Sequence, residues 1–109
     1  MDMVKLGLRF DMRAPAFGAD RPRLYQEMLR ICAWADEVGF ATVRISEHHG
    51  VDDGYLPAPL IAAAAIAART RRIRLSIAAI PLPFHDPVLV AEQIAILDHI
   101  SEGRVDLTL

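Results

Sequence analysis

Residues 57–80, PAPLIAAAAIAARTRRIRLSIAAI, place one helix and one strand directly in succession. The alanine-rich part opens on Pro57 and Pro59, residues that are common at the start of a helix, and it should remain helical to about Arg69. Ile73–Ile80 is a short apolar run with the length of a buried strand. Parallel sheets are built from such pairs, because each strand needs a crossover helix to reach the next one.

The same alternation of strand and helix extends along the whole chain. The sequence predicts four strands, at Val4–Phe10, Ala41–Ser46, Ile73–Ile80 and Arg104–Leu109, whose starts lie 37, 32 and 31 residues apart. It predicts three helices, one from Pro22 to Gly39 with Asp20 as its N-cap, one over 57–69, and one around 90–97 that ends before Gly103. The spacing is that of a βαβ unit, so the predicted fold class is α/β with parallel βα units.

Two architectures fit this order of elements, namely an open four-stranded sheet and half of an eight-stranded TIM barrel. A closed barrel needs about 250 residues, whereas 109 residues form three βα units and a fourth strand. That fourth strand would lack the helix that normally covers a parallel strand. We therefore expect residues 1–109 to form one partial domain, either the N-terminal part of something larger or a chain that assembles with copies of itself.

The composition excludes several classes of protein. Apolar residues make up 53% of the chain and charged residues 24%, which is typical of a globular domain. The net charge is −2 and no basic stripe is present, which argues against nucleic-acid binding, and Arg69–Arg74 is interpreted as a solvated helix end. The uncharged run Tyr55–Ala68 has 14 residues, whereas a membrane span needs roughly 20. The single cysteine, Cys32, is predicted to pack in the core and indicates a reducing, cytoplasmic location.

Candidate catalytic groups gather at the predicted carboxyl ends of the strands, where parallel α/β folds bind their ligands. Glu47-His48-His49 follows the second strand, and a histidine is a natural proton-transfer group near neutral pH. If the extended backbone continues, Glu47 and His49 share one side and His48 takes the other, so only one histidine points easily into a site. The functional interpretation is a general base or hydrogen-bond donor over a bound ligand. The alternative is a polar loop that caps the following segment.

Other patterns leave their alternatives open. Phe10, at the end of the first strand, is a candidate cofactor contact that could stack on a ring, or it could pack in the core. The small pair Ala78-Ala79 would let a flat ligand approach, although spacing alone favours ordinary packing. A metal site is disfavoured, because neighbouring histidines on an extended segment diverge and no His-x-His spacing is present. The residues of metal-ligand type are Glu47, His48, His49 and His85.

An ordered series of short motifs carries a resemblance to a known family. The series comprises Gly39-Phe40 before a strand, Glu47-His48-His49, Ala78-Ala79, the His85-Asp86-Pro87 loop and the turn at 101–104. With the opening VKLGLRFDMR at residues 4–13, it resembles the N-terminal half of the bacterial luciferase-like family over nearly the whole chain. That family contains flavin-dependent monooxygenases and deazaflavin-dependent oxidoreductases.

The resemblance implies a TIM barrel of which this chain is the N-terminal half. It implies that reduced flavin mononucleotide (FMN), supplied by a flavin reductase, reacts with dioxygen to oxygenate a small organic substrate. A deazaflavin coenzyme with hydride transfer is the alternative. His48 matches the family's catalytic histidine, Glu47 precedes it at the site wall, and a non-prolyl cis peptide falls on Ala78-Ala79 beneath the flavin ring. His49 matches the second histidine, whose role varies, and His85 receives no role.

Two further hypotheses stand beside the flavin enzyme. Most contacts to the flavin phosphate in the family come from the second half of the barrel, so a chain of this length should hold flavin weakly or not at all. The chain could instead be a half-barrel fragment that self-associates without turnover. The third hypothesis is a metal-dependent hydrolase built on the glutamate–histidine cluster.

Overall fold

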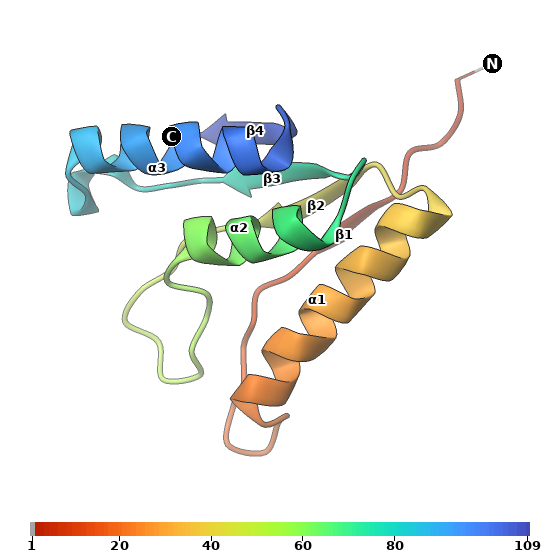
Figure 1. The fold of residues 1–109 in the computed structure, drawn as a ribbon. Helices are drawn as coiled ribbons and strands as arrows, with labels where there is room; N and C mark the ends of the chain where they lie inside the picture. Colours follow the sequence, from red (N-terminus) through yellow and green to blue (C-terminus); the bar gives the residue numbers. More distant parts are fainter. Residues whose placement is uncertain (1) are drawn as a thin grey trace.

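The computed structural model describes residues 2–109, which form a four-stranded parallel sheet and three α-helices in alternation (Figure 1). The strands are β1 (Gly7–Arg9), β2 (Thr42–Ile45), β3 (Arg74–Ala78) and β4 (Val105–Thr108). The helices are α1 (Arg21–Val38), α2 (Pro59–Arg69) and α3 (Pro87–Ser101), with a short 3₁₀-helix, η1 (Leu82–Phe84), before α3. The strands lie in the order β1-β2-β3-β4, so the predicted α/β class with parallel βα units is confirmed.

Capping residues set where two of the helices begin and end. Asp20 is the N-cap of α1, as predicted, and accepts a hydrogen bond from the N–H of Arg23 at 3.3 Å. Gly39 ends α1 with a φ of 92°, the left-handed conformation that glycine adopts at little cost. Asp86 caps α3 by accepting from two backbone N–H groups of its first turn. None of the helices in residues 2–109 combines the length and the apolar character needed to cross a membrane.

The strands are shorter than the sequence predicts. β1 covers Gly7–Arg9 instead of Val4–Phe10, because its partner β2 begins at Thr42, which lies in register with Gly7. The helix after β2 begins at Pro59, two residues later than the predicted start at Pro57. These differences move the edges of elements and leave their order unchanged.

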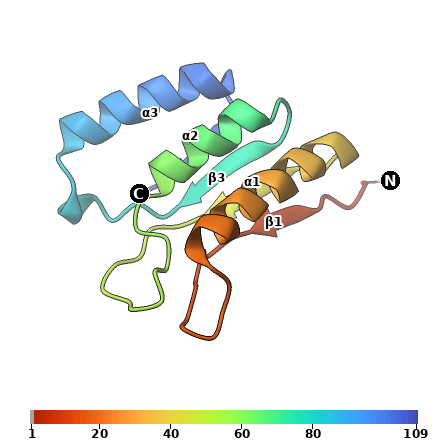
Figure 2. The ribbon, with the colours of Figure 1, turned by 60° about the horizontal axis from the view of Figure 1, so that its bottom comes forward.

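All three helices lie on the same face of the sheet (Figures 1 and 2). Alternate strand residues point at that face, where Val43, Ile45, Leu75 and Ile77 are each at most 2% exposed. The residues between them, such as Arg44 and Ser76, point to the opposite face, which no helix of residues 2–109 covers. We call this the open face of the sheet, and in a closed barrel it would line the interior.

The single cysteine belongs to the core, as predicted. Cys32 lies in α1 with its side chain fully buried against the sheet and α2. Burial raises the pKa of its thiol to about 12. Cys32 is therefore a packing residue and no part of the candidate site.

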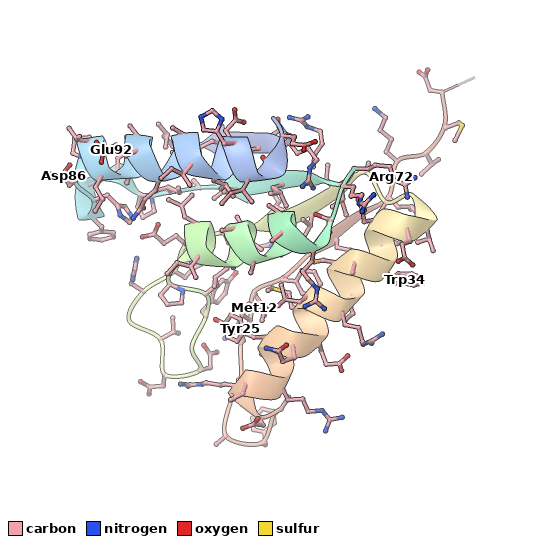
Figure 3. All side chains as sticks on the ribbon, viewed as in Figure 1. Met12, Tyr25, Trp34, Arg72, Asp86 and Glu92 are labelled. Atoms are coloured by element: carbon pink, nitrogen blue, oxygen red, sulfur yellow. The ribbon has the colours of Figure 1, made fainter. Side chains whose placement is uncertain are left out.

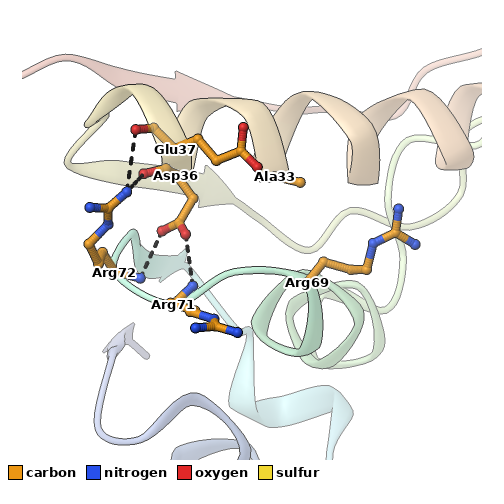
Figure 4. A pocket seen from close by; sticks show the side chains of 6 residues that line it. All are labelled: Ala33, Asp36, Glu37, Arg69, Arg71 and Arg72. Atoms are coloured by element: carbon orange, nitrogen blue, oxygen red, sulfur yellow. Dashed lines mark hydrogen bonds between the residues drawn. The ribbon is translucent and has the colours of Figure 1, made fainter.

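A buried carboxylate holds α1 to the start of β3 at the amino ends of the strands. Asp36 accepts hydrogen bonds from the backbone N–H groups of Arg71 and Arg72 at 2.9 and 2.7 Å (Figure 4). It also accepts one from the N–H of Ile73 at 2.7 Å. Burial by itself would raise the pKa of Asp36, but the three backbone hydrogen bonds and the charge of Arg72 outweigh it and hold the pKa below its ordinary value. The stretch Arg69–Arg74 is thus more than the predicted solvated helix end, since Arg72 also donates to two carbonyls of α1 and Arg74 belongs to β3.

A buried guanidinium ties α2 and α3 together at the same end of the sheet. Arg104 donates to the carbonyls of Ala67, Thr70, Ile73 and Ser101 at 2.6 to 3.1 Å and to the Thr70 hydroxyl at 2.8 Å. Three of these carbonyls lie at the C-terminal ends of α2 and α3, where the helix dipoles are negative and favour a cation. The amino end of the sheet is therefore held together by the hydrogen bonds of Asp36 and Arg104.

Candidate functional site

The loops that follow β1, β2 and β3 meet at the carboxyl edge of the sheet. Asp86, labelled in Figure 3, begins α3 at this edge, whereas Arg72 lies at the opposite end of the molecule. The N–H of Leu56 donates to the Asp11 carbonyl at 3.0 Å, and Arg13 forms a 2.6 Å ion pair with Asp53. The loop after β1 and the loop after β2 therefore contact each other at this edge.

The backbone after β2 stays extended long enough for its side chains to alternate. Ser46 and His48 lie together on one side, with 3.1 Å between the Ser46 Oγ and the His48 Nε2. Glu47 and His49 lie together on the other side, with 2.5 Å between a Glu47 oxygen and the His49 Nε2. The predicted division of the two histidines between opposite sides is confirmed.

His48 is the imidazole that is free to act on a ligand. Its ring packs against Tyr55 with 3.8 Å between the ring centroids, and its backbone N–H donates to the Leu56 carbonyl at 3.0 Å. The His48 side chain is exposed, and its Nδ1 has no hydrogen-bond partner among residues 2–109. One ring nitrogen is thus held by Ser46 while the other can exchange a proton with a bound molecule.

Glu47 points to the helix side of the sheet instead. Its side chain is 1% exposed, and one carboxylate oxygen lies 2.7 Å from the Nε2 of His85 and 2.5 Å from the Nε2 of His49. The second oxygen lies 2.9 Å from the same His85 nitrogen. The backbone N–H of Glu47 donates to the carbonyl of Ala79 at 3.4 Å. Glu47 therefore links the loop after β2 to the loop after β3.

His85 is a residue that the sequence left without a role. It lies 38 residues after Glu47, and nothing local in the sequence marks the two as neighbours. The useful signal is its position: Asp86 caps α3, so His85 stands at the start of that helix, at the edge where Glu47 also lies. A buried carboxylate needs a donor, and His85 is one of the two side chains that supply it.

The peptide bond between Ala78 and Ala79 is cis, as the resemblance predicts. Ile45 pairs with Ile77 in the sheet, so the following residues, Ser46 and Ala78, both face the open side by alternation. The Ala79 carbonyl accepts from Glu47, which places the pair beside the glutamate–histidine segment. A contact between these alanines and a cofactor stays a prediction.

Phe10 takes the packing alternative that the sequence left open. Its side chain is partly buried against the hydrophobic core, and its N–H donates to the Arg44 carbonyl at 3.1 Å. By alternation Phe10 follows Arg9 on the open face and so turns to the helix side. Its role as a cofactor contact stays a prediction.

The carboxyl edge contains a small cavity of about 210 Å³ between the starts of α2 and α3. Glu47 and His85 line it together with Pro57, Ala58 and Leu89. A larger hollow of about 510 Å³, lined by Asp36 and three arginines, lies at the opposite end of the sheet (Figure 4). Among residues 2–109, no group of three or more His, Cys, Asp and Glu side chains is arranged to hold a metal ion.

The fold and the site together define a partial parallel α/β barrel that carries an exposed histidine and a cis alanine pair at its carboxyl edge. Residues 8–109 match the family of luciferase-like monooxygenases, and the chain belongs to that family. The predicted membership is therefore confirmed, and the half-barrel is favoured over the open sheet.

Solved structures and a curated relative agree with this assignment. The monooxygenase RslO1 from Streptomyces bottropensis is 40% identical, with a TM-score of 0.86 over 95% of this chain and 32% of its own. The oxygenating constituent of 3,6-diketocamphane monooxygenase from Pseudomonas putida, solved in complex with FMN, is 30% identical, with a TM-score of 0.84 over 96% of this chain and 29% of its own. The oxygenase component of a flavin-dependent trigonelline monooxygenase from Acinetobacter baylyi is 34% identical over 78% of this chain and 24% of its own. The chain thus spans 24 to 32% of the length of these proteins.

Proposed function

We propose that this chain is the N-terminal part of a flavin-dependent monooxygenase that uses reduced FMN and dioxygen to oxygenate a small organic substrate. The observation that carries the proposal is the environment of His48. Its imidazole is exposed, lies on the same side of the backbone as Ser46, and has no partner at Nδ1 among residues 2–109. Two relatives support the cofactor class, since one is named as flavin-dependent and another was solved with FMN.

The open face at the carboxyl edge suits a flat ring. Ser46 and Ala78 carry small side chains there, and the imidazole of His48 with the ring of Tyr55 forms an aromatic wall beside them. Reduced flavin bound at this place would supply the electrons for the reaction with dioxygen. Ser46 would fix the His48 ring through Nε2, and His48 would hold or move a proton at Nδ1.

We also propose that the reduced flavin comes from a separate flavin reductase. The names of two relatives describe an oxygenase component and an oxygenating constituent, which are each one part of a larger system. Mixing a flavin reductase, FMN and NADH with the protein should support oxygenation. Chemically reduced FMN should support it equally well.

A second candidate is a non-catalytic half-barrel that associates with a second copy of itself. An apolar groove of about 290 Å³ between α2 and α3 favours it, because Ile61 and Ile96 beside the groove are 75% and 60% exposed. A stable pair would bury these side chains. In this case the carboxyl edge would carry no flavin.

Gel filtration with light scattering and a visible spectrum, on the same sample incubated with excess FMN, separates the two candidates. The flavin proposal expects a shifted flavin band that travels with the protein and weakens in His48→Gln. His99→Gln, which changes an exposed histidine of α3, is the matched control. A colourless dimer would support the second candidate. Stronger retention of a 5-deazaflavin than of FMN would instead favour the deazaflavin alternative.

A further inference from the structure

Two histidines from different loops converge on one buried carboxylate. The Nε2 atoms of His49 and His85 lie 2.5 and 2.7 Å from the same oxygen of Glu47. The glutamate side chain is 1% exposed, whereas the side chains of His49 and His85 are 45% and 29% exposed. The carboxylate is thus closed off from water and depends on the two imidazoles for its hydrogen bonds.

The hydrogen-bond chemistry fixes how both imidazoles must be protonated. An ionised carboxylate only accepts, so each Nε2 must carry a hydrogen when it contacts Glu47. Neither His49 nor His85 has another partner at Nδ1 among residues 2–109. The carboxylate therefore selects the Nε2–H form of both rings.

The same carboxylate connects two loops that both border the candidate site. The backbone N–H of Glu47 reaches the Ala79 carbonyl, and its side chain reaches His85 seven residues beyond Ala78, so the loop after β2 is held to the loop after β3 at two points. His48 stands between Glu47 and His49, both of which are held on the helix side. Its own side chain is thereby directed to the open face.

We propose that His85 is a positioning residue for His48 and acts through Glu47. This inference rests on the proposed function of His48 as the proton-transfer group. Without the His85 donor, the buried carboxylate keeps a single partner and moves toward water or rotates, because an unsatisfied buried charge is costly. The segment that carries His48 and His49 moves with it, and the His48 ring loses its fixed orientation.

Three substitutions at one position test this role. His85→Gln keeps a side-chain N–H that can reach Glu47, His85→Leu keeps the volume without a donor, and His85→Asn has an amide too short to reach. His99→Leu on the exposed face of α3 is the matched control. Long-range ¹H–¹⁵N spectra of the imidazoles report the tautomer of His49 and the environment of His48 without any flavin. FMN titration of the same variants measures the affinity of the candidate site for FMN.

We expect His85→Leu and His85→Asn to leave His49 in its Nε2–H form as the remaining partner of Glu47, to shift the His48 ring signals and to weaken FMN binding by about tenfold. His85→Gln should restore the His48 signals and keep FMN affinity within about twofold. Unchanged His48 signals in both His85→Leu and His85→Asn would overturn the inference. It would also be overturned if His85→Gln shifted the His48 signals and weakened FMN binding as much as His85→Leu does. If no variant and not even the native chain binds FMN, the proposed function fails, while the imidazole spectra still decide the role of His85.

Discussion

The Nε2 of His85 lies 2.7 Å from a carboxylate oxygen of Glu47, although 38 residues separate the two along the chain. The contact exists because β2 and β3 are parallel neighbours, so the loops that follow them meet at one edge. Two of the three histidines at this edge contact the buried carboxylate. His48 lies on the other side of the backbone, where Ser46 contacts its Nε2 and its Nδ1 has no partner among residues 2–109.

The first prediction concerns His48 itself. His48→Gln should lower the rate of oxygenation by about 10² to 10⁴, the usual contribution of a positioned proton-transfer group, in an assay with reduced FMN. The free energy of unfolding should stay nearly constant, because the side chain is exposed. His99→Gln is the control, and a rate that falls equally in both variants would speak against a catalytic His48.

The second prediction concerns Asp36 at the other end of the sheet. Asp36→Ala should lower the free energy of unfolding by about 3 kcal/mol, because three backbone N–H groups lose their acceptor. Urea denaturation at pH 7 measures the loss. Asp36→Asn, which keeps one acceptor oxygen, should lose less, and a loss that is no smaller would contradict this explanation.

The same residue predicts a dependence on pH. The folded chain holds the pKa of Asp36 below the ordinary value of 3.8, so its stabilisation is complete above that value and is lost as the pH falls through the lower, folded pKa. The gap in stability between the native chain and Asp36→Asn should therefore shrink below about pH 4. A gap that is constant from pH 7 to pH 2 would show that the carboxylate charge is not the cause.

The third prediction concerns Arg104. Arg104→Lys should destabilise the chain by about 2 to 4 kcal/mol, because an ammonium has three donors and cannot reach the carbonyls of α2, of α3 and of Ile73 before β3 together. Thermal unfolding checks this. Arg30→Lys, on the exposed side of α1, is the control and should leave the melting temperature within about one degree.

The fourth prediction concerns the buried thiol. Because burial raises the pKa of Cys32 to about 12, the thiolate that reacts with a disulfide reagent is scarce at pH 8. The native chain should react at least about 10²-fold more slowly than the urea-unfolded chain. Comparable rates in the two states would mean that α1 opens freely from the sheet.

Much of the fold could be predicted because its signals are local. The caps Asp20 and Gly39 and the spacing of the apolar strands are visible in the sequence, and they mark α1 and the order of the sheet. Strand ends were less predictable, because pairing depends on where the neighbouring strand begins, as it does for β1. The alternation of Glu47, His48 and His49 followed from the strand period alone.

The rest of the site depends on contacts between distant segments. The role of His85 could not be predicted, since it rests on the packing of the β3–α3 loop against Glu47. The three N–H groups that Asp36 binds belong to a different βα unit from its own. The sequence could not decide whether Phe10 contacts a cofactor or packs in the core, because the period of a strand does not say which face a helix will cover.

One measurement tests the central claim, that FMN binds at the open face of the carboxyl edge. FMN fluorescence is titrated with the native chain, with Ala78→Leu, which fills the space beside β3, and with Ala91→Leu, which adds the same bulk on the exposed surface of α3. The account predicts that the native chain and Ala91→Leu quench the flavin equally and that Ala78→Leu, while still folded, quenches it at least about tenfold more weakly. Equal quenching by all three proteins, or none by the native chain, would contradict it.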